Sequence, residues 1–284
     1  MTGADIATDS ARAPYVCHRT PQRPALTGRL DDPVWAAAER SPRFADMVDG
    51  SPGLYDTHAA AVWDDDALYV GYWIEEPYPV ARLAERDSII FTENDVELFL
   101  EGEDCYYELE INALGTLYEV LFIWRDAAGQ GSRFDVPELD PRRTRALTFG
   151  GDDDRSGTTF WRGSHPRGLR WAYPEWDLPG LRAAVHVDGA INDSNAVSRG
   201  WTVELAVPWS GLDLVAGSRR MPPADGDTWR MFFGRFQQLV LGGREIQPHP
   251  AWVWSPHGVY DTHRPELWTP VRFSEEPLDL PPAH

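Results

Sequence analysis

The chain has 284 residues, of which 26 are Lys or Arg and 45 are Asp or Glu, so the formal net charge is −19. This length is sufficient for one large β domain or two ordinary domains. The negative charge argues against nucleic acid as a partner, because the phosphates would be repelled, and against an anionic membrane surface for the same reason. Neutral small molecules, including neutral sugars, remain the expected class of ligand.

The N-terminal sequence MTGADIATDSARAPY has no basic start and no apolar run, so it does not predict a signal peptide. No apolar run in the chain is long enough to span a bilayer. We therefore expect a soluble cytoplasmic protein, or a secreted one if a leader has been removed. Cys17 and Cys105 are the only cysteines, and two cysteines do not predict a disulfide scaffold.

The first third of the chain predicts short strands and one short helix. Residues 1–14 are small and polar and are expected to be disordered. An edge strand is predicted at 15–19, and a helix follows that Asp31 or Asp32 caps, with Pro33 in its first turn. Residues 58–63 and 68–75 predict two strands, because the Asp64–Asp66 run between them is typical of a hairpin turn.

Two alternating segments, 94–100 and 106–112, predict a second hairpin with one apolar face. The opposite face is unusual because it gathers Glu97, Glu108 and Glu110 on neighbouring strands. Like charges directly opposite one another destabilise a sheet, so strand formation does not account for them. The cluster therefore indicates a ligand, a metal ion, or an Arg brought from elsewhere in the chain.

The remainder predicts more strands, at 117–124, 181–187, 201–207, 229–238, 251–255 and 267–273. Residues 125–180 between them show little periodicity but carry several tryptophans, which favours an ordered loop over a disordered one. Many short strands predict an all-β fold, a two-sheet antiparallel β-sandwich that is jelly-roll-like, with this loop as an insertion. We expect a single domain at 15–274 and a Pro-rich tail at 275–284. Leu98, Leu109, Ile111, Val203 and Leu205 are expected in its core.

The sequence resembles a known family in several segments that occur in the same order, from about residue 24 to 273. They include LTGRLDDPVWAAAE, VWDDDALYVGYWIEEP, NDVELFL, YYELEINALGT, GWTVELAVPW and VWSPHGVYDTHRPELW. These segments resemble the family 9 carbohydrate-binding modules, and more closely the longer bacterial proteins called family 9-like. The resemblance implies a β-sandwich in which two aromatic rings clamp a terminal sugar and polar side chains bind its hydroxyls. It also implies that structural calcium is common.

The resemblance also suggests positions for the sugar site. The first clamp ring corresponds to Phe91, six residues before Glu97, and the second to Tyr260 or His263. The hydroxyl-binding strand corresponds to Glu110 and Asn112, with Glu110 in the place of an Arg found in the sugar binders. The loops 87–91, 125–180 and 256–266 are then expected to converge on the main cleft.

The residues themselves leave three roles open for the acidic cluster. Glu97, Glu108 and Glu110 have the chemistry to accept hydrogen bonds from sugar hydroxyls, to ligate Ca²⁺, or to act as an acid/base pair. The structural alternative is a salt-bridge network with Arg82, Arg86 or Arg235, the last sharing a strand face with Gln237. The predicted ligand-binding residues are Phe91, Glu97, Glu108, Glu110, Asn112, Arg235, Tyr260 and His263.

Our first hypothesis is a non-catalytic protein that binds a carbohydrate or another neutral small molecule. It requires no cofactor, is compatible with structural calcium, and leaves the metal ligands unassigned. The alternative is a stand-alone enzyme on the same scaffold, a glycosidase, lyase or small-molecule cyclase, with Glu97, Glu110 and His263 as catalytic residues. A third hypothesis is an interaction protein that binds another protein through residues 125–180.

Overall fold

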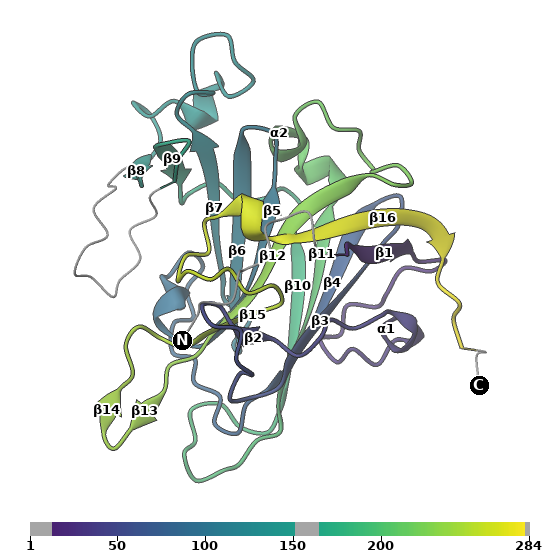
Figure 1. The fold of residues 1–284 in the computed structure, drawn as a ribbon, viewed down its shortest axis with the longest axis vertical. Coiled ribbons are helices and arrows are strands. Elements are labelled where there is room, and N and C mark those ends of the chain that lie inside the picture. Colours follow the sequence, from purple (N-terminus) through teal and green to yellow (C-terminus); the bar gives the residue numbers. More distant parts are fainter. Residues whose placement is uncertain (1–12, 151–164, 282–284) are drawn as a thin grey trace, which may run out of the picture.

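The computed structural model describes residues 13–150 and 165–281, and strands dominate this part of the chain (Figure 1). The strands of the first half are β1 (Tyr15–Arg19), β2 (Ala45–Asp46), β3 (Thr57–Trp63), β4 (Ala67–Glu75), β5 (Asp95–Glu101), β6 (Cys105–Asn112), β7 (Leu117–Trp124) and β8 (Leu147–Phe149). Those of the second half are β9 (Arg170–Tyr173), β10 (Arg182–Asp188), β11 (Gly200–Pro208), β12 (Thr228–Phe236), β13 (Val240–Leu241), β14 (Arg244–Glu245), β15 (Ala251–Val253) and β16 (Thr269–Pro277).

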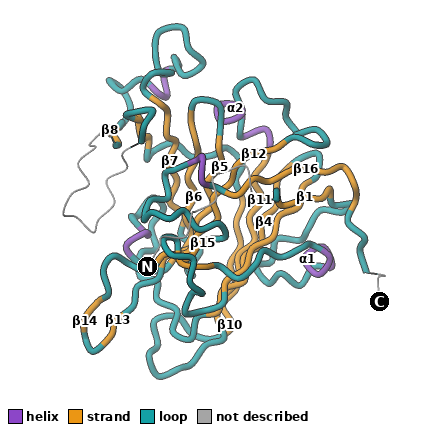
Figure 2. The backbone as a smooth tube through the Cα atoms, in the orientation of Figure 1, coloured by secondary structure: helices purple, strands orange, loops and turns teal. Residues whose placement is uncertain are grey.

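Helical residues in the described chain are confined to single turns between strands (Figure 2). The two α-helices are α1 (Pro33–Ala37) and α2 (Asp213–Ala216), and the 3₁₀ turns are η2 (Ile90–Thr92), η3 (Pro137–Leu139), η4 (Trp209–Gly211) and η5 (Pro265–Leu267). The predicted cap is confirmed, because the Asp32 side chain accepts a hydrogen bond from the Val34 N–H at 3.0 Å. No helix of the described residues is long and apolar enough to cross a membrane.

The main sheet is a continuous series of strands in the order β10-β11-β4-β3-β1-β16-β12-β5-β6-β7-β9-β8, with β15 and β2 attached beside β12. The series folds back on itself where β1 meets β16, which gives two layers of a β-sandwich (Figure 1). Strand β1 was predicted at an edge, and that prediction is wrong. It pairs on both sides, in parallel, with β16 and with β3, and it thereby joins the two layers.

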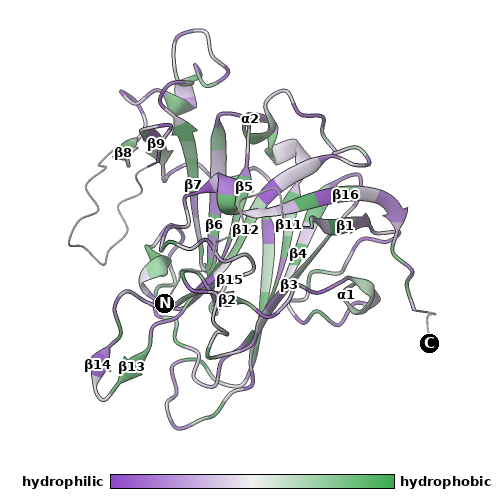
Figure 3. Ribbon diagram, in the orientation of Figure 1, coloured by the Kyte–Doolittle hydropathy of each residue, from purple (hydrophilic) through white to green (hydrophobic). Residues whose placement is uncertain are grey.

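The hydrophobic core lies between the two layers, and the sequence predicted its members correctly. Leu98, Leu109, Ile111, Val203 and Leu205 are each at most 1% exposed and belong to one continuous cluster. A hydrogen bond crosses the same space, in which the Tyr72 hydroxyl donates to the Glu97 carbonyl at 2.7 Å. The alternation of each strand therefore decides which side chains enter the core, and Figure 3 shows how hydropathy is distributed along the strands.

The outer faces of the two layers are covered by different parts of the chain. Helix α1 packs Val34 and Trp35 against β3, β4 and β11 in a second apolar cluster. The outer face of β12-β5-β6-β7 carries a third, aromatic cluster that the segment before β16 covers with Tyr260 and Trp268. Part of the predicted insertion, residues 151–164, lies outside the described residues. The rest of it contributes β8 and β9, which extend this second layer beyond β7.

Candidate functional site

The predicted hairpin forms as β5 and β6, and its register brings carboxylates together on the outer face. Glu97 pairs directly with Glu110, and Asp95 lies two residues from Glu97 on the same face. One carboxylate oxygen from each of Asp95, Glu97 and Glu110 lies within 4.8 Å of the others. Glu108 lies on β6, two residues before Glu110 and on the same face. None of the four side chains is more than 4% exposed. We call these four residues the acidic cluster.

Burial is the largest influence on the electrostatics of the acidic cluster. Burial, together with the charges of the neighbouring carboxylates, raises the pKa of Glu97 and Glu110 well above the usual range. Burial also raises the pKa of Asp95, although the backbone N–H of Phe236 opposes this rise, and it raises the pKa of Glu108 to about 8. Both oxygens of Asp95 and one oxygen of each glutamate have no partner in good hydrogen-bond geometry.

His263, a predicted ligand-binding residue, lies beside the acidic cluster. Its Nε2 is 3.5 Å from a Glu108 oxygen, and its Nδ1 is 2.9 Å from the Tyr106 hydroxyl. Arg170 donates to the Tyr106 hydroxyl at 2.9 Å and to the His263 carbonyl at 3.2 Å. Burial, and secondarily the charge of Arg170, holds the pKa of His263 well below its usual value, so the ring is neutral at neutral pH.

Aromatic rings surround the acidic cluster. Phe91 is 38% exposed and packs edge-on against Tyr118, with ring centroids 5.7 Å apart. Tyr118 pairs with Glu110 across the β6–β7 ladder. Burial raises the pKa of both Tyr118 and Tyr260, and charges of the acidic cluster raise it further, because both phenols lie close to these carboxylates. Phe91 therefore lies next to the strand that flanks Glu110, and a cleft shared by Phe91 and Tyr260 stays a prediction.

Two predicted site residues have other roles. Asn112 is fully buried, donates to the Leu83 carbonyl, and accepts from two N–H groups of the turn that follows it. Arg235 was expected to reach the acidic cluster, and that prediction is wrong. It pairs with Val96, whose side chain enters the core, so its guanidinium lies on the opposite face of the sheet.

Sequence reasoning did not include Asp95, Tyr118, Tyr106 and Arg170 among the site residues. Asp95 could have been found, because it follows the same alternation as Glu97 along the strand. Tyr118 and Arg170 could not, because their approach depends on the β6–β7 and β7–β9 pairings. No local pattern in the sequence sets those pairings.

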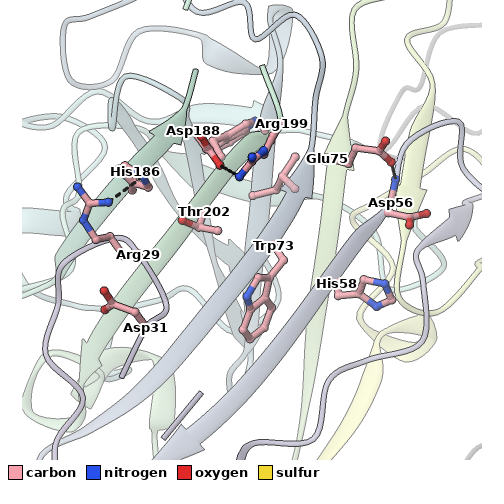
Figure 4. A pocket seen from close by; sticks show the side chains of 13 residues that line it. Arg29, Asp31, Asp56, His58, Trp73, Glu75, His186, Asp188, Arg199 and Thr202 are labelled. Carbon is pink, nitrogen blue, oxygen red and sulfur yellow. Dashed lines mark hydrogen bonds and ion pairs between the residues drawn. The ribbon is translucent and has the colours of Figure 1, made fainter. Parts of the chain in front are cut away.

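A separate cavity of about 520 Å³ lies on the outer face of the other layer (Figure 4). Its floor is a row of residues that face one another across four strands, namely His58, Trp73, Thr202 and His186. Arg29 and the Asp188–Arg199 ion pair contribute to its rim. The main cleft was expected beside the loops 87–91, 125–180 and 256–266. None of these loops lines this cavity, whereas residues of the 125–180 segment, among them Glu138 and Trp176, line a second cavity of about 620 Å³. The convergence of the three loops on one cleft stays a prediction.

Comparison with known proteins gives one family and several solved structures. Residues 56–140 match the model of a family described as Carbohydrate-binding family 9. A putative carbohydrate-binding protein from Bacteroides uniformis has a similar fold, with a TM-score of 0.56 and 15% identity over 92% of this chain and 100% of that one. No curated protein matches the chain.

A family 9 carbohydrate-binding module from Caldicellulosiruptor kristjanssonii is also similar in fold. Its structure with cellotriose gives a TM-score of 0.52 and 11% identity over 95% of this chain and 99% of that one. Its structure with glucose gives a TM-score of 0.50 and 12% identity over 94% of this chain and 100% of that one. At these identities the likeness concerns the fold, which extends over nearly the whole of both chains.

Proposed function

We propose that this chain, which resembles carbohydrate-binding family 9 over residues 56–140 and has the fold of a family 9 module, binds a neutral sugar at the acidic cluster. The observation that carries the proposal is the arrangement on the outer face of β5-β6-β7. An accessible ring, Phe91, packs against Tyr118 beside a group of carboxylates, and each of these carboxylates has at least one oxygen without a partner in good hydrogen-bond geometry. A sugar can stack its apolar ring face on Phe91 and donate hydrogen bonds from its hydroxyls to the carboxylate oxygens.

The chemistry of the site restricts the class of sugar. The net charge of −19 disfavours uronic acids and phosphorylated sugars, because their own negative charge would be repelled. Neutral hydroxyls are good donors to carboxylate oxygens. Glucose and short glucose oligomers, which the family 9 module similar in fold holds in its structures, are therefore the first probes to use.

Replacing Phe91 with alanine should weaken sugar binding by roughly 10- to 100-fold. The ring covers an apolar face worth roughly 1.5–3 kcal/mol when fully buried, and each 1.4 kcal/mol is about tenfold in affinity. Phe91 is partly exposed on a 3₁₀ turn, so the variant should fold normally. Isothermal titration calorimetry with glucose, cellobiose and cellotriose measures the effect.

Trp73→Ala is the matched control, because it removes an aromatic ring from the cavity of Figure 4. Sugar affinity should be unchanged in this variant. If Trp73→Ala abolishes binding while Phe91→Ala does not, the sugar binds in that cavity and our placement is wrong. If the unmodified protein binds none of the three sugars at millimolar concentration, the proposal is wrong for this ligand class.

One observation favours an enzyme as the second candidate. A general acid must hold its proton at neutral pH, and burial raises the pKa of Glu108 to about 8. The neutral His263 ring lies 3.5 Å from Glu108. The oxygens of Asp95, Glu97 and Glu110, which lie within 4.8 Å of one another, are compatible with the roughly 5 Å carboxyl spacing of retaining glycosidases. In an enzyme, Glu97→Gln or Glu110→Gln should abolish turnover of aryl glycosides while ligand binding persists. In a binding protein there is no turnover to lose.

A further inference from the structure

Tyr118 continues a row of side chains across the outer face of β5, β6 and β7. The ladders place Glu97 opposite Glu110, and Glu110 opposite Tyr118. The three side chains therefore lie side by side on successive strands that are about 4.8 Å apart. At the end of the row the Tyr118 ring meets Phe91, with ring centroids 5.7 Å apart and ring planes at 72°. The row thus leads from two carboxylates to a pair of aromatic rings.

The Tyr118 side chain has the features of a ligand contact. It is half-buried, and its hydroxyl has no hydrogen-bond partner among the described residues. This hydroxyl is also not one of the described buried polar atoms, so it is accessible. Burial, and then the charges of Glu108 and Glu110, raise the pKa of the phenol. The Tyr118 hydroxyl therefore keeps its proton at neutral pH and is a hydrogen-bond donor.

The two positions that were predicted for a second ring are engaged elsewhere. The Tyr260 hydroxyl donates to the His249 carbonyl at 2.7 Å. His263 is 7% exposed, and its two ring nitrogens face other side chains. In the described chain, the ring that packs against Phe91 is that of Tyr118.

We propose that Tyr118, rather than Tyr260 or His263, is the second aromatic ring of the sugar site. This inference rests on the proposed function and adds a contact to it. Ring planes at 72° form a corner, in which a pyranose lies with its apolar face on one ring and its edge against the other. Its hydroxyls then extend along the row to Glu110 and Glu97, and the Tyr118 hydroxyl donates to a sugar oxygen.

The donor on Tyr118 determines which sugar oxygens the site can bind. An ionised carboxylate only accepts, so it binds hydroxyls and not ether oxygens. The phenol binds an ether oxygen as well, and the ring oxygen of a pyranose is one. Glucitol is an open-chain polyol that has neither this ring oxygen nor an apolar ring face. It should therefore bind at least about tenfold more weakly than glucose.

Isothermal titration calorimetry with glucose, cellobiose and cellotriose tests the assignment. Tyr118→Phe removes only the donor and should weaken binding about 2- to 12-fold, the range for one neutral hydrogen bond. Tyr118→Ala also removes the ring and should weaken binding further. Tyr78→Phe is the matched control, because it makes the same change in a tyrosine that is 48% exposed outside the site. Its affinity should equal that of the original protein.

Nuclear magnetic resonance of the unmodified protein with ring-labelled tyrosine tests the same contact without a substitution. Glucose should shift the resonances of Tyr118 and leave those of Tyr260 in place. This measurement and Tyr118→Phe decide the question if Tyr118→Ala does not fold by circular dichroism.

Three results would overturn the inference while sugar binding itself persists. They are an unchanged affinity in both Tyr118 variants, a shift of the Tyr260 resonances without a shift of those of Tyr118, and glucitol binding as tight as that of glucose. A protein that binds none of the three sugars contradicts the proposed function, and this inference with it.

Discussion

Arg235→Met should lower the free energy of unfolding by about 3–5 kcal/mol, the usual result of removing one member of a buried ion pair. Arg235 is fully buried and lies 3.5 Å from a Glu76 oxygen. It also donates to the Thr57 hydroxyl at 2.8 Å and to the Glu75 carbonyl at 2.9 Å. Methionine fills a similar space but leaves Glu76 without its counter-charge.

Urea denaturation of the variant and the original protein measures this loss. The matched control is Arg219→Met, because Arg219 is partly exposed in its pair with Glu101 and exposed pairs contribute about 0–1 kcal/mol. Adding Glu76→Gln to Arg235→Met should recover part of the stability, since the uncompensated charge is then gone. A loss below about 1 kcal/mol in Arg235→Met would show that the pair is not the reason for the buried arginine.

Leu205→Ala should cost about 2–5 kcal/mol, the range for removing a buried leucine side chain and leaving a cavity. Leu205 is 1% exposed in β11, where Val70 and Ala183 are its neighbours across the ladders. Residues on both sides are held by strand pairing, so the core has little freedom to close the cavity. Chemical denaturation measures the change.

Val197→Ala provides the comparison for Leu205→Ala, because Val197 is 73% exposed outside any strand. Truncating it should change the free energy of unfolding by no more than about 0.5 kcal/mol. If the two variants lose similar stability, the assignment of Leu205 to the core is contradicted.

The sequence was most informative where structure depends on local alternation. The hairpin was predicted at 94–100 and 106–112 and forms at Asp95–Glu101 and Cys105–Asn112, with Glu97 opposite Glu110. Period-two alternation sets which side chains share a face, and a short loop sets the register. The gathering of carboxylates on one face therefore followed from the sequence.

Most of the misses have a common physical cause, which is dependence on pairings between distant segments, whereas the Asn112 miss has a local cause. Arg235 was assigned to the wrong face because its strand pairs with β5 from far along the chain. Asn112 lies on the same strand face as Glu110, as predicted, but its side-chain oxygen accepts hydrogen bonds from the turn that follows it. The alternation of a strand does not reveal such a hydrogen bond. Predicting the floor of the Figure 4 cavity would require the registers of three strand pairs, which place His58 beside Trp73, Trp73 beside Thr202, and Thr202 beside His186.

The parallel pairing of β1 with β16 has a consequence for how the protein is made. Tyr15 lies opposite Val271, so the junction between the layers cannot form until the ribosome has released almost the whole sequence. Local hairpins such as β3–β4 and β5–β6 can form much earlier. During that interval the nascent chain carries an unpaired β1 edge and an open apolar face, the state in which strands associate with the wrong partner. Chains cut short before Thr269 should accordingly depend on chaperones.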